Sequence, residues 1–101
     1  MKDVLITVTG MNYRYGSEFL KKGMKVKLVK EPDNEHDKEV IRVDYKGLGT
    51  IGYVANSTKT VMGECLSAGR LYDKIGKKGK AKVVIKLDGA VICKVSEDSL
   101  K

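Results

Sequence analysis

Apolar and polar side chains alternate in several short runs along the chain, and this period of two predicts half-buried β-strands. In the first run Val4, Ile6 and Val8 occupy every second position. In the second run Val26 and Leu28 lie between lysines. Four more runs follow, at residues 40–46, 51–54, 82–87 and 90–95. The pattern therefore predicts about six short strands.

Glycine-containing turns separate these runs and indicate how the strands connect. Gly47 and Gly49 lie in the short segment between the third and fourth runs, which predicts a hairpin. Asp88-Gly89 separates the last two runs, and this dipeptide is the strongest hairpin signal in the sequence. We therefore expect two antiparallel hairpins.

One segment has the period of a helix instead. Residues 56–58 carry side-chain oxygens that suit a helix N-cap. Apolar residues then recur at spacings of three and four within residues 61–66, and Gly69 follows as a natural stop. The spacing predicts a helix over residues 57–68.

These elements together favour an all-β fold with one or two short helices. About six short strands with one inserted helix are typical of a small OB-like or SH3-like β-barrel. The strands do not alternate with helices, which argues against a parallel nucleotide-binding sheet. We expect residues 1–101 to form one such domain.

Composition and charge narrow the classes of protein. The chain has 101 residues, 20 basic and 13 acidic, with a formal net charge of +7. Such a balance favours an anionic partner, with nucleic acid first. The longest uncharged stretch, Gly47 to Thr58, has 12 residues, whereas a membrane-spanning helix needs about 20. We therefore expect no membrane span, and no short apolar run near the N-terminus fits a signal peptide.

The two cysteines do not suggest a disulfide scaffold or a metal site. Cys65 and Cys93 lie among apolar neighbours, and the chain has a single histidine, His36. A structural zinc site would need four ligands, which these three residues cannot supply. We interpret both cysteines as core residues of a protein in a reducing, cytoplasmic setting, and we expect no cofactor.

Charge is distributed unevenly along the chain. Residues 70–94 hold eight basic and two acidic side chains, whereas residues 31–39 hold five acidic and one basic. Lys77, Lys78 and Lys80 in the basic part would attract phosphates. The alternative is that they form a solvated loop, followed by lysines 82 and 86 on the outer face of an edge strand, where lysine blocks edge-to-edge pairing.

Residues 33–37 form the first group with possible chemistry. Acidic groups at alternate positions resemble a calcium loop, but Lys38 stands where that loop needs glycine and Asp44 where it needs glutamate. His36 beside Asp37 would suit half of a hydrolytic site, but no nucleophile signature accompanies them. A minimal nuclease is therefore the weakest functional hypothesis.

Residues 12–15 form the second group, in which two tyrosines flank an arginine directly after the first predicted strand. Tyr13 and Arg14 would suit base stacking and phosphate contact. The alternative is that a tyrosine packs in the core with its hydroxyl satisfied. Spacing alone does not separate these two interpretations.

Three segments of the sequence resemble the HIRAN family. They are "VTGMNYRYG" at residues 8–16, "KGMKVKLVKEPDNEHDKEVIRV" at residues 22–43 and "GTIGYV" at residues 49–54. The Pro-Asx-Asn-x-x-Asp core at residues 32–37 is the most specific of the matching motifs. The resemblance extends over residues 4–68.

The resemblance implies an OB-like barrel that binds single-stranded DNA and prefers a free 3′-hydroxyl end. On this pattern Asp37 would accept the proton of the terminal hydroxyl. The family often has an arginine where Asn12 stands and an aromatic residue where His36 stands. The residues implied in the pocket are Asn12, Tyr13, Arg14, His36, Asp37 and Tyr53.

Two functional hypotheses from different classes follow. The first is a non-catalytic single-stranded DNA-binding module for 3′-end recognition in DNA repair or replication-fork processing, with a helicase or nuclease acting in trans. The second is a protein-interaction adaptor on a small barrel, whose basic C-terminal third docks an acidic partner. Salt-dependent oligonucleotide binding would separate them.

Overall fold

The computed structural model describes residues 3–11, 16, 18–35, 37–57 and 59–101. It contains six strands, one short helix and a 3-10 turn near the C-terminus. These elements are β1 (Leu5–Thr9), β2 (Lys25–Glu31), β3 (Val40–Tyr45), β4 (Gly49–Val54), α1 (Ala68–Tyr72), β5 (Lys78–Leu87), β6 (Ala90–Val95) and η2 (Glu97–Ser99).

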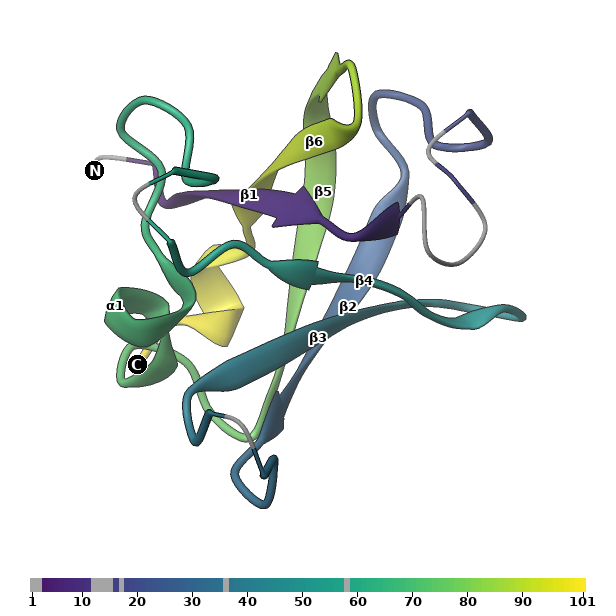
Figure 1. Ribbon diagram of the computed structural model, residues 1–101. Coiled ribbons are helices and arrows are strands. Elements are labelled where there is room, and N and C mark those ends of the chain that lie inside the picture. Colours follow the sequence, from purple (N-terminus) through teal and green to yellow (C-terminus); the bar gives the residue numbers. More distant parts are fainter. Residues whose placement is uncertain (1–2, 12–15, 17, 36, 58) are drawn as a thin grey trace.

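The six strands form a closed barrel in the order β1-β4-β3-β2-β5-β6 (Figure 1). Every neighbouring pair is antiparallel, and β6 closes the barrel by pairing with β1 from Leu5↔Lys94 to Val8↔Val91. This architecture confirms the predicted all-β, OB-like barrel. Both predicted hairpins are also present, β3 with β4 and β5 with β6.

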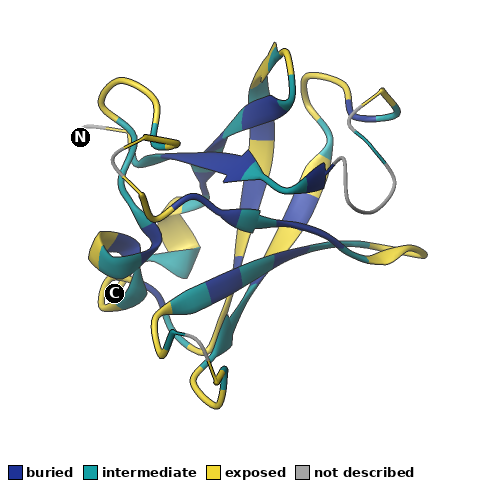
Figure 2. Cartoon of the chain, in the orientation of Figure 1, coloured by how far each residue is buried: buried dark blue, intermediate teal, exposed yellow. Residues whose placement is uncertain are grey.

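The core fills the barrel interior and is built by the alternation seen in the sequence (Figure 2). In β2, for example, Val26 and Leu28 are buried while Lys25 and Lys27 are exposed. Leu71 of α1 is also fully buried, so the helix covers part of the core. Inward apolar and outward charged residues thus define the two faces of each strand.

Strand β5 is longer than the sequence pattern predicted. It begins at Lys78 rather than Lys82, and its first half pairs with β2 while its second half pairs with β6. The inward positions in the first half are Gly79, which has no side chain, and Ala81, whose side chain is small. The sequence therefore shows no clear alternation of large apolar and polar residues there. The predicted solvated loop at Lys78 and Lys80 is therefore a strand.

The predicted edge strand is also wrong. Because the barrel is closed, β5 has a hydrogen-bonded neighbour on each side. Lys82 has register partners on both sides, Lys25 of β2 and Lys94 of β6, so it has no sheet edge to protect, whereas Lys86 is paired only with Val91 of β6.

The predicted helix over residues 57–68 is wrong in position. The helix begins after Ser67, whose hydroxyl oxygen accepts a hydrogen bond from the N–H of Arg70, and Gly69 lies inside it. The preceding segment instead runs beside β1. The N–H of Leu66 donates to the carbonyl of Leu5, and the N–H of Met62 donates to the hydroxyl of Thr7. Backbone pairing with β1 thus prevails over the helical spacing of the side chains.

Candidate nucleic-acid interface

Four of the residues predicted to form the pocket, Asn12, Tyr13, Arg14 and His36, lie outside the described residues. The described residues on either side of positions 12–15 are nevertheless placed. Met11 is fully buried, and its carbonyl accepts a hydrogen bond of 2.7 Å from the N–H of Gly16. Residues 11 and 16 therefore lie next to one another, directly after β1.

Tyr53 lies in β4 beside that place. Its register partners are Thr9, the last residue of β1, and Arg42 of β3. Residues directly opposite one another in antiparallel strands point to the same face. Tyr53 is half-buried on the outer face, between the end of β1 and a basic side chain.

The glycine before Tyr53 is required by the close approach of β1. A Cβ on Gly52 would lie 2.6 Å from the carbonyl oxygen of Thr9 and 3.1 Å from the Met11 side chain. Any larger residue would push the end of β1 away from β4. Gly52 therefore sets where the segment after β1 lies relative to Tyr53.

Asp37 lies in the acidic β2–β3 loop and has both carboxylate oxygens engaged. One oxygen accepts from the N–H of Glu39 at 2.9 Å, and the other accepts from the side-chain amide of Asn56 at 3.2 Å. The N–H of Asp37 donates to the side-chain oxygen of Asn34. These contacts hold the half-buried Asp37 carboxylate in one orientation.

Asn56 connects the acidic loop to two other elements, and the sequence analysis did not single it out as a site residue. It follows β4, donates to Asp37, and accepts a 2.8 Å hydrogen bond from the N–H of Gly69 in α1. A Cβ on Gly69 would come within 3.0 Å of Glu39 and 3.3 Å of Asn56, so a glycine allows this close packing. Asn56 therefore ties the Asp37 carboxylate to the chain that leaves β4, the strand that contains Tyr53.

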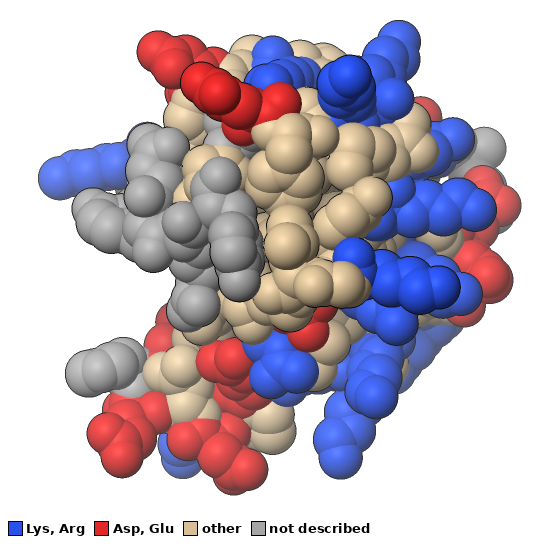
Figure 3. All heavy atoms as spheres, turned by 90° about the vertical axis from the view of Figure 1, so that its right-hand side faces the viewer, with Lys and Arg blue, Asp and Glu red and all other residues tan. Residues whose placement is uncertain are grey.

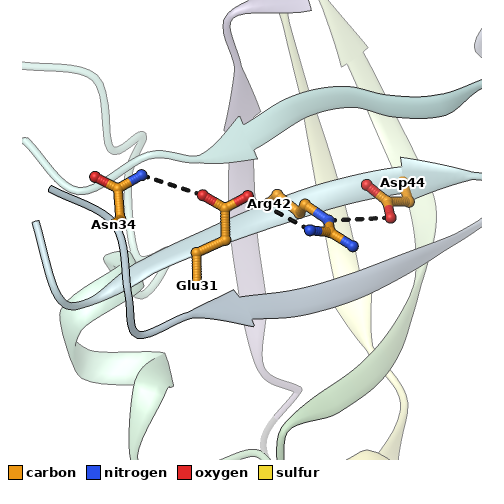
Figure 4. A network of polar contacts seen from close by, with 4 residues as sticks. All are labelled: Glu31, Asn34, Arg42 and Asp44. Atoms are coloured by element: carbon orange, nitrogen blue, oxygen red, sulfur yellow. Dashed lines mark hydrogen bonds and ion pairs between the residues drawn. The ribbon is translucent and has the colours of Figure 1, made fainter. Parts of the chain in front are cut away.

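A chain of polar contacts follows the outer surface from the acidic loop to β3 (Figure 4). Asn34 donates to Glu31 at 3.1 Å, and Glu31 lies 3.6 Å from Arg42. Arg42 in turn contacts Asp44 at 3.2 Å. Arg42 is thus held between two carboxylates, and Asn34 has a structural role in the loop.

The basic residues predicted to attract phosphates lie on and beside β5. Lys78 and Lys80 are exposed on its outer face, and the carbonyl of Lys77 accepts from the N–H of Lys30. Figure 3 shows lysine and arginine side chains in a column along one side of the barrel; acidic side chains gather at the lower end of the other side, and others lie at the top and beside the basic column. Charge is therefore unevenly distributed on this face as well as in the sequence.

A groove of about 710 Å³ crosses this basic side. It is lined by residues of β2, β3 and β5 and by the C-terminal residues 98–101, with five basic and two acidic side chains among them. A smaller hollow of about 420 Å³ lies beside the start of the acidic loop. Arg42 lines both spaces, which are therefore adjacent.

Other chemistry is limited among the residues that the structure describes. Within this part of the chain, no group of three His, Cys, Asp or Glu side chains could hold a metal ion. No helix in it is long and apolar enough to cross a membrane. Cys93 is a buried core residue, as predicted, whereas Cys65 is only partly buried and does not belong to the core. Burial raises the pKa of the Cys93 thiol to about 12.

The family model for the HIRAN domain matches residues 1–86 of the chain. The chain belongs to the HIRAN domain family. HIRAN domains are known for binding DNA and are not catalytic by themselves. In this HIRAN domain the match ends within β5, so β6 and the C-terminal turn lie beyond it. Comparison with curated proteins and with solved structures found no significant match.

Proposed function

We propose that this HIRAN domain is a non-catalytic module that binds single-stranded DNA and recognises a free 3′-hydroxyl end. The observation that carries the proposal is the Asp37 carboxylate, which Glu39 and Asn56 orient on the half-exposed side of the acidic loop. A carboxylate has about four acceptor sites. Asp37 therefore retains acceptor capacity for a hydroxyl group.

The charge of the loop explains why a chain end is preferred. A terminal hydroxyl donates a hydrogen bond to a carboxylate, whereas a 3′-phosphate or a continuing phosphodiester has no such donor and is repelled by negative charge. The acidic loop carries the negative charges of Asp33, Glu35 and Asp37. This arrangement favours binding of a free 3′-hydroxyl end over binding at an internal phosphodiester.

The remaining pocket residues supply contacts to bases and phosphates. Tyr53 offers a ring beside the end of β1, from which residues 12–14 continue. Stacking contributes about 1–3 kcal/mol per base without reading its identity. The pocket and its basic approach comprise Asn12, Tyr13, Arg14, His36, Asp37 and Tyr53, with Lys77, Lys78 and Lys80 attracting the backbone.

A module that only binds a strand end needs partners to act on it. We place this domain in cytoplasmic DNA repair or replication-fork processing, where 3′ ends are exposed. A helicase or nuclease acting in trans would supply the chemistry.

The test compares two oligonucleotides that differ only in a 3′-hydroxyl or a 3′-phosphate. We expect the parent to prefer the hydroxyl by about tenfold or more, as one hydrogen bond to a charged group contributes about 1.5–3 kcal/mol. Asp37→Asn should reduce this preference to within about twofold, because the charge that repels phosphate is lost. Tyr13→Ala should weaken both complexes. Fluorescence anisotropy measures the affinity of each protein for both oligonucleotides.

Asp33→Asn is the matched control, because it removes the same charge from the same loop and leaves the contacts of Asp37 in place. This variant should keep most of the preference for the hydroxyl. Equal affinity of the parent for both ends contradicts end recognition. A parent that binds no oligonucleotide at low salt supports the protein-interaction adaptor instead.

A further inference from the structure

The outer face of β2 and β5 carries five exposed lysines. We call this surface the lysine face, and it consists of Lys25, Lys27, Lys78, Lys80 and Lys82. Lys25 is directly opposite Lys82, and Lys27 is directly opposite Lys80. In such pairs the Cβ atoms are about 4.5–5.5 Å apart, and like charges destabilise the sheet.

The fold does not neutralise this repulsion. Among the described residues, none of the five lysines has an ion-pair partner. The nearest acidic residue across the sheet is Asp44, the register partner of Lys27, and its carboxylate is already paired with Arg42. Edge protection does not explain Lys27 or Lys82 either, because each of them has a register partner on both sides. An anion from outside the chain would remove the repulsion.

The shape of the lysine face suits an extended anion. The C-terminal turn packs over β5, where the N–H of Lys80 donates to the hydroxyl of Ser99 at 2.9 Å and Gly79 leaves room for that side chain. Residues of the turn line the 710 Å³ groove together with Lys27, Lys78 and Lys80, and five basic side chains face two acidic ones, Asp44 and Asp98, around it. The surface is therefore a channel rather than a flat patch.

The spacing of the charges matches a nucleic-acid backbone. Alternate strand residues are about 6.6 Å apart, so Lys78 to Lys82 spans about 13 Å. A row of this length can contact more than one phosphate of a strand, because a nucleic-acid backbone carries one negative charge per nucleotide. A compact anion would use only two of the five lysines, whereas a strand of phosphates would use them all.

We propose that the lysine face and its groove are a second, end-independent binding site for the phosphate backbone of single-stranded DNA. The strand would continue from the acidic loop past Arg42, which lines both spaces, and onto β2 and β5. The inference rests on the proposed function in taking single-stranded DNA as the ligand. It does not require that the 3′ end be recognised.

The test measures the salt dependence of binding to a single strand of about 12 nucleotides, a length within the range that small barrels cover. Lys27→Gln/Lys80→Gln should weaken binding by about tenfold at low salt and reduce the slope of log K against log salt by about 1.4. The preference for a 3′-hydroxyl over a 3′-phosphate should stay unchanged. The melting temperature of Lys27→Gln/Lys80→Gln should equal or exceed that of the parent, because the variant lacks a like-charge pair.

Lys46→Gln/Lys59→Gln is the matched control, since both residues are exposed, lie in turns and are not among the five lysines of the lysine face. It removes the same charge and should change the slope by much less. Lys25→Gln/Lys82→Gln provides an independent second variant on the lysine face. Equal losses in the control and lysine-face variants, or a parent that binds no oligonucleotide, would overturn the inference.

The two proposals fail in different ways. If the parent binds both 3′ forms equally while the lysine-face variants lose salt dependence, end recognition is wrong and the lysine face stands. If the 3′ preference is present and the lysine-face variants keep the full salt slope, the lysine face is wrong and end recognition stands.

Discussion

Asn56 illustrates how one side chain positions three parts of the barrel. Its amide donates to Asp37 in the acidic loop, its oxygen accepts from Gly69 in α1, and its backbone follows β4. Asn56 therefore fixes the Asp37 carboxylate relative to β4, the strand that contains Tyr53. In the sequence it reads as an ordinary helix-capping asparagine, because no local pattern reveals its distant partners.

The buried thiol of Cys93 makes the stability of the protein depend on pH in the alkaline range. Burial, and secondarily the nearby Cys65, raise the pKa of its thiol to about 12. An exposed thiol in the unfolded chain ionises near pH 8.5. The folded state thus keeps a proton that the unfolded state loses, and this contribution to stability is complete below about pH 8.5.

We therefore expect the free energy of unfolding to fall as pH rises from about 8.5 towards 12, by up to about 1.4 kcal/mol per pH unit from this thiol. Urea unfolding of the parent and Cys93→Ala, under reducing conditions at a series of pH values, measures the effect. The stability advantage of the parent should shrink over this interval. Cys65→Ala keeps Cys93 and should retain the steep decline; a constant difference between parent and Cys93→Ala would refute the assignment.

At the scale of elements, the pairing of β1 with β4 determines where the pocket lies. Val8↔Val54 and Thr9↔Tyr53 bring the two strands together, and Gly52 allows the carbonyl of Thr9 to approach closely. The Gly-Tyr pair thus has two separate purposes, since the glycine places the end of β1 and the tyrosine presents a ring beside it.

Gly52→Ala should destabilise the barrel by about 1–3 kcal/mol, because its Cβ would overlap the Thr9 carbonyl and force the strands apart. Gly76→Ala is the control, since the nearest atom to its Cβ would be 4.0 Å away. That substitution should change stability by no more than about 0.5 kcal/mol. Thermal unfolding measures both variants, and equal stability of the two would contradict the close approach of β1 and β4.

At the scale of the whole molecule, closure of the barrel separates the charges. The β2–β3 loop gathers acidic side chains, whereas β2 and β5 carry the lysine face (Figure 3). The positive charge of the lysine face and the negative charge of the acidic loop therefore lie at different places on the barrel. A strand of DNA would meet attraction along the barrel and repulsion at the acidic loop, a gradient that orients it.

The same charge distribution predicts that salt stabilises the folded protein. Adjacent lysines repel one another in the barrel, and added salt screens this repulsion over a Debye length of about 10 Å at 0.1 M. The melting temperature of the parent should rise as sodium chloride is added from low concentration. The rise should be smaller in Lys27→Gln/Lys80→Gln, and calorimetry of both proteins checks this; a melting temperature independent of salt would show that the repulsion is negligible.

The strands and hairpins follow from local patterns, and the sequence predicted them well. Period-two alternation needs only neighbouring residues, as in Val26 and Leu28, and Gly89 suits its turn because it adopts a positive φ of 77°. The helix was misplaced because the backbone of residues 61–66 pairs with β1. One of its contacts, between Met62 and Thr7, joins residues 55 positions apart.

The sequence alone determined the all-β class, the hairpins, the family motif and the excess of positive charge, because each is a property of composition or of near neighbours. Tertiary structure alone decided that β5 is an interior strand, that Lys27 is directly opposite Lys80, and that Asn56 holds Asp37. These features depend on which distant segments pair when the barrel closes. Register is a relation between two strands, and neither strand encodes it by itself.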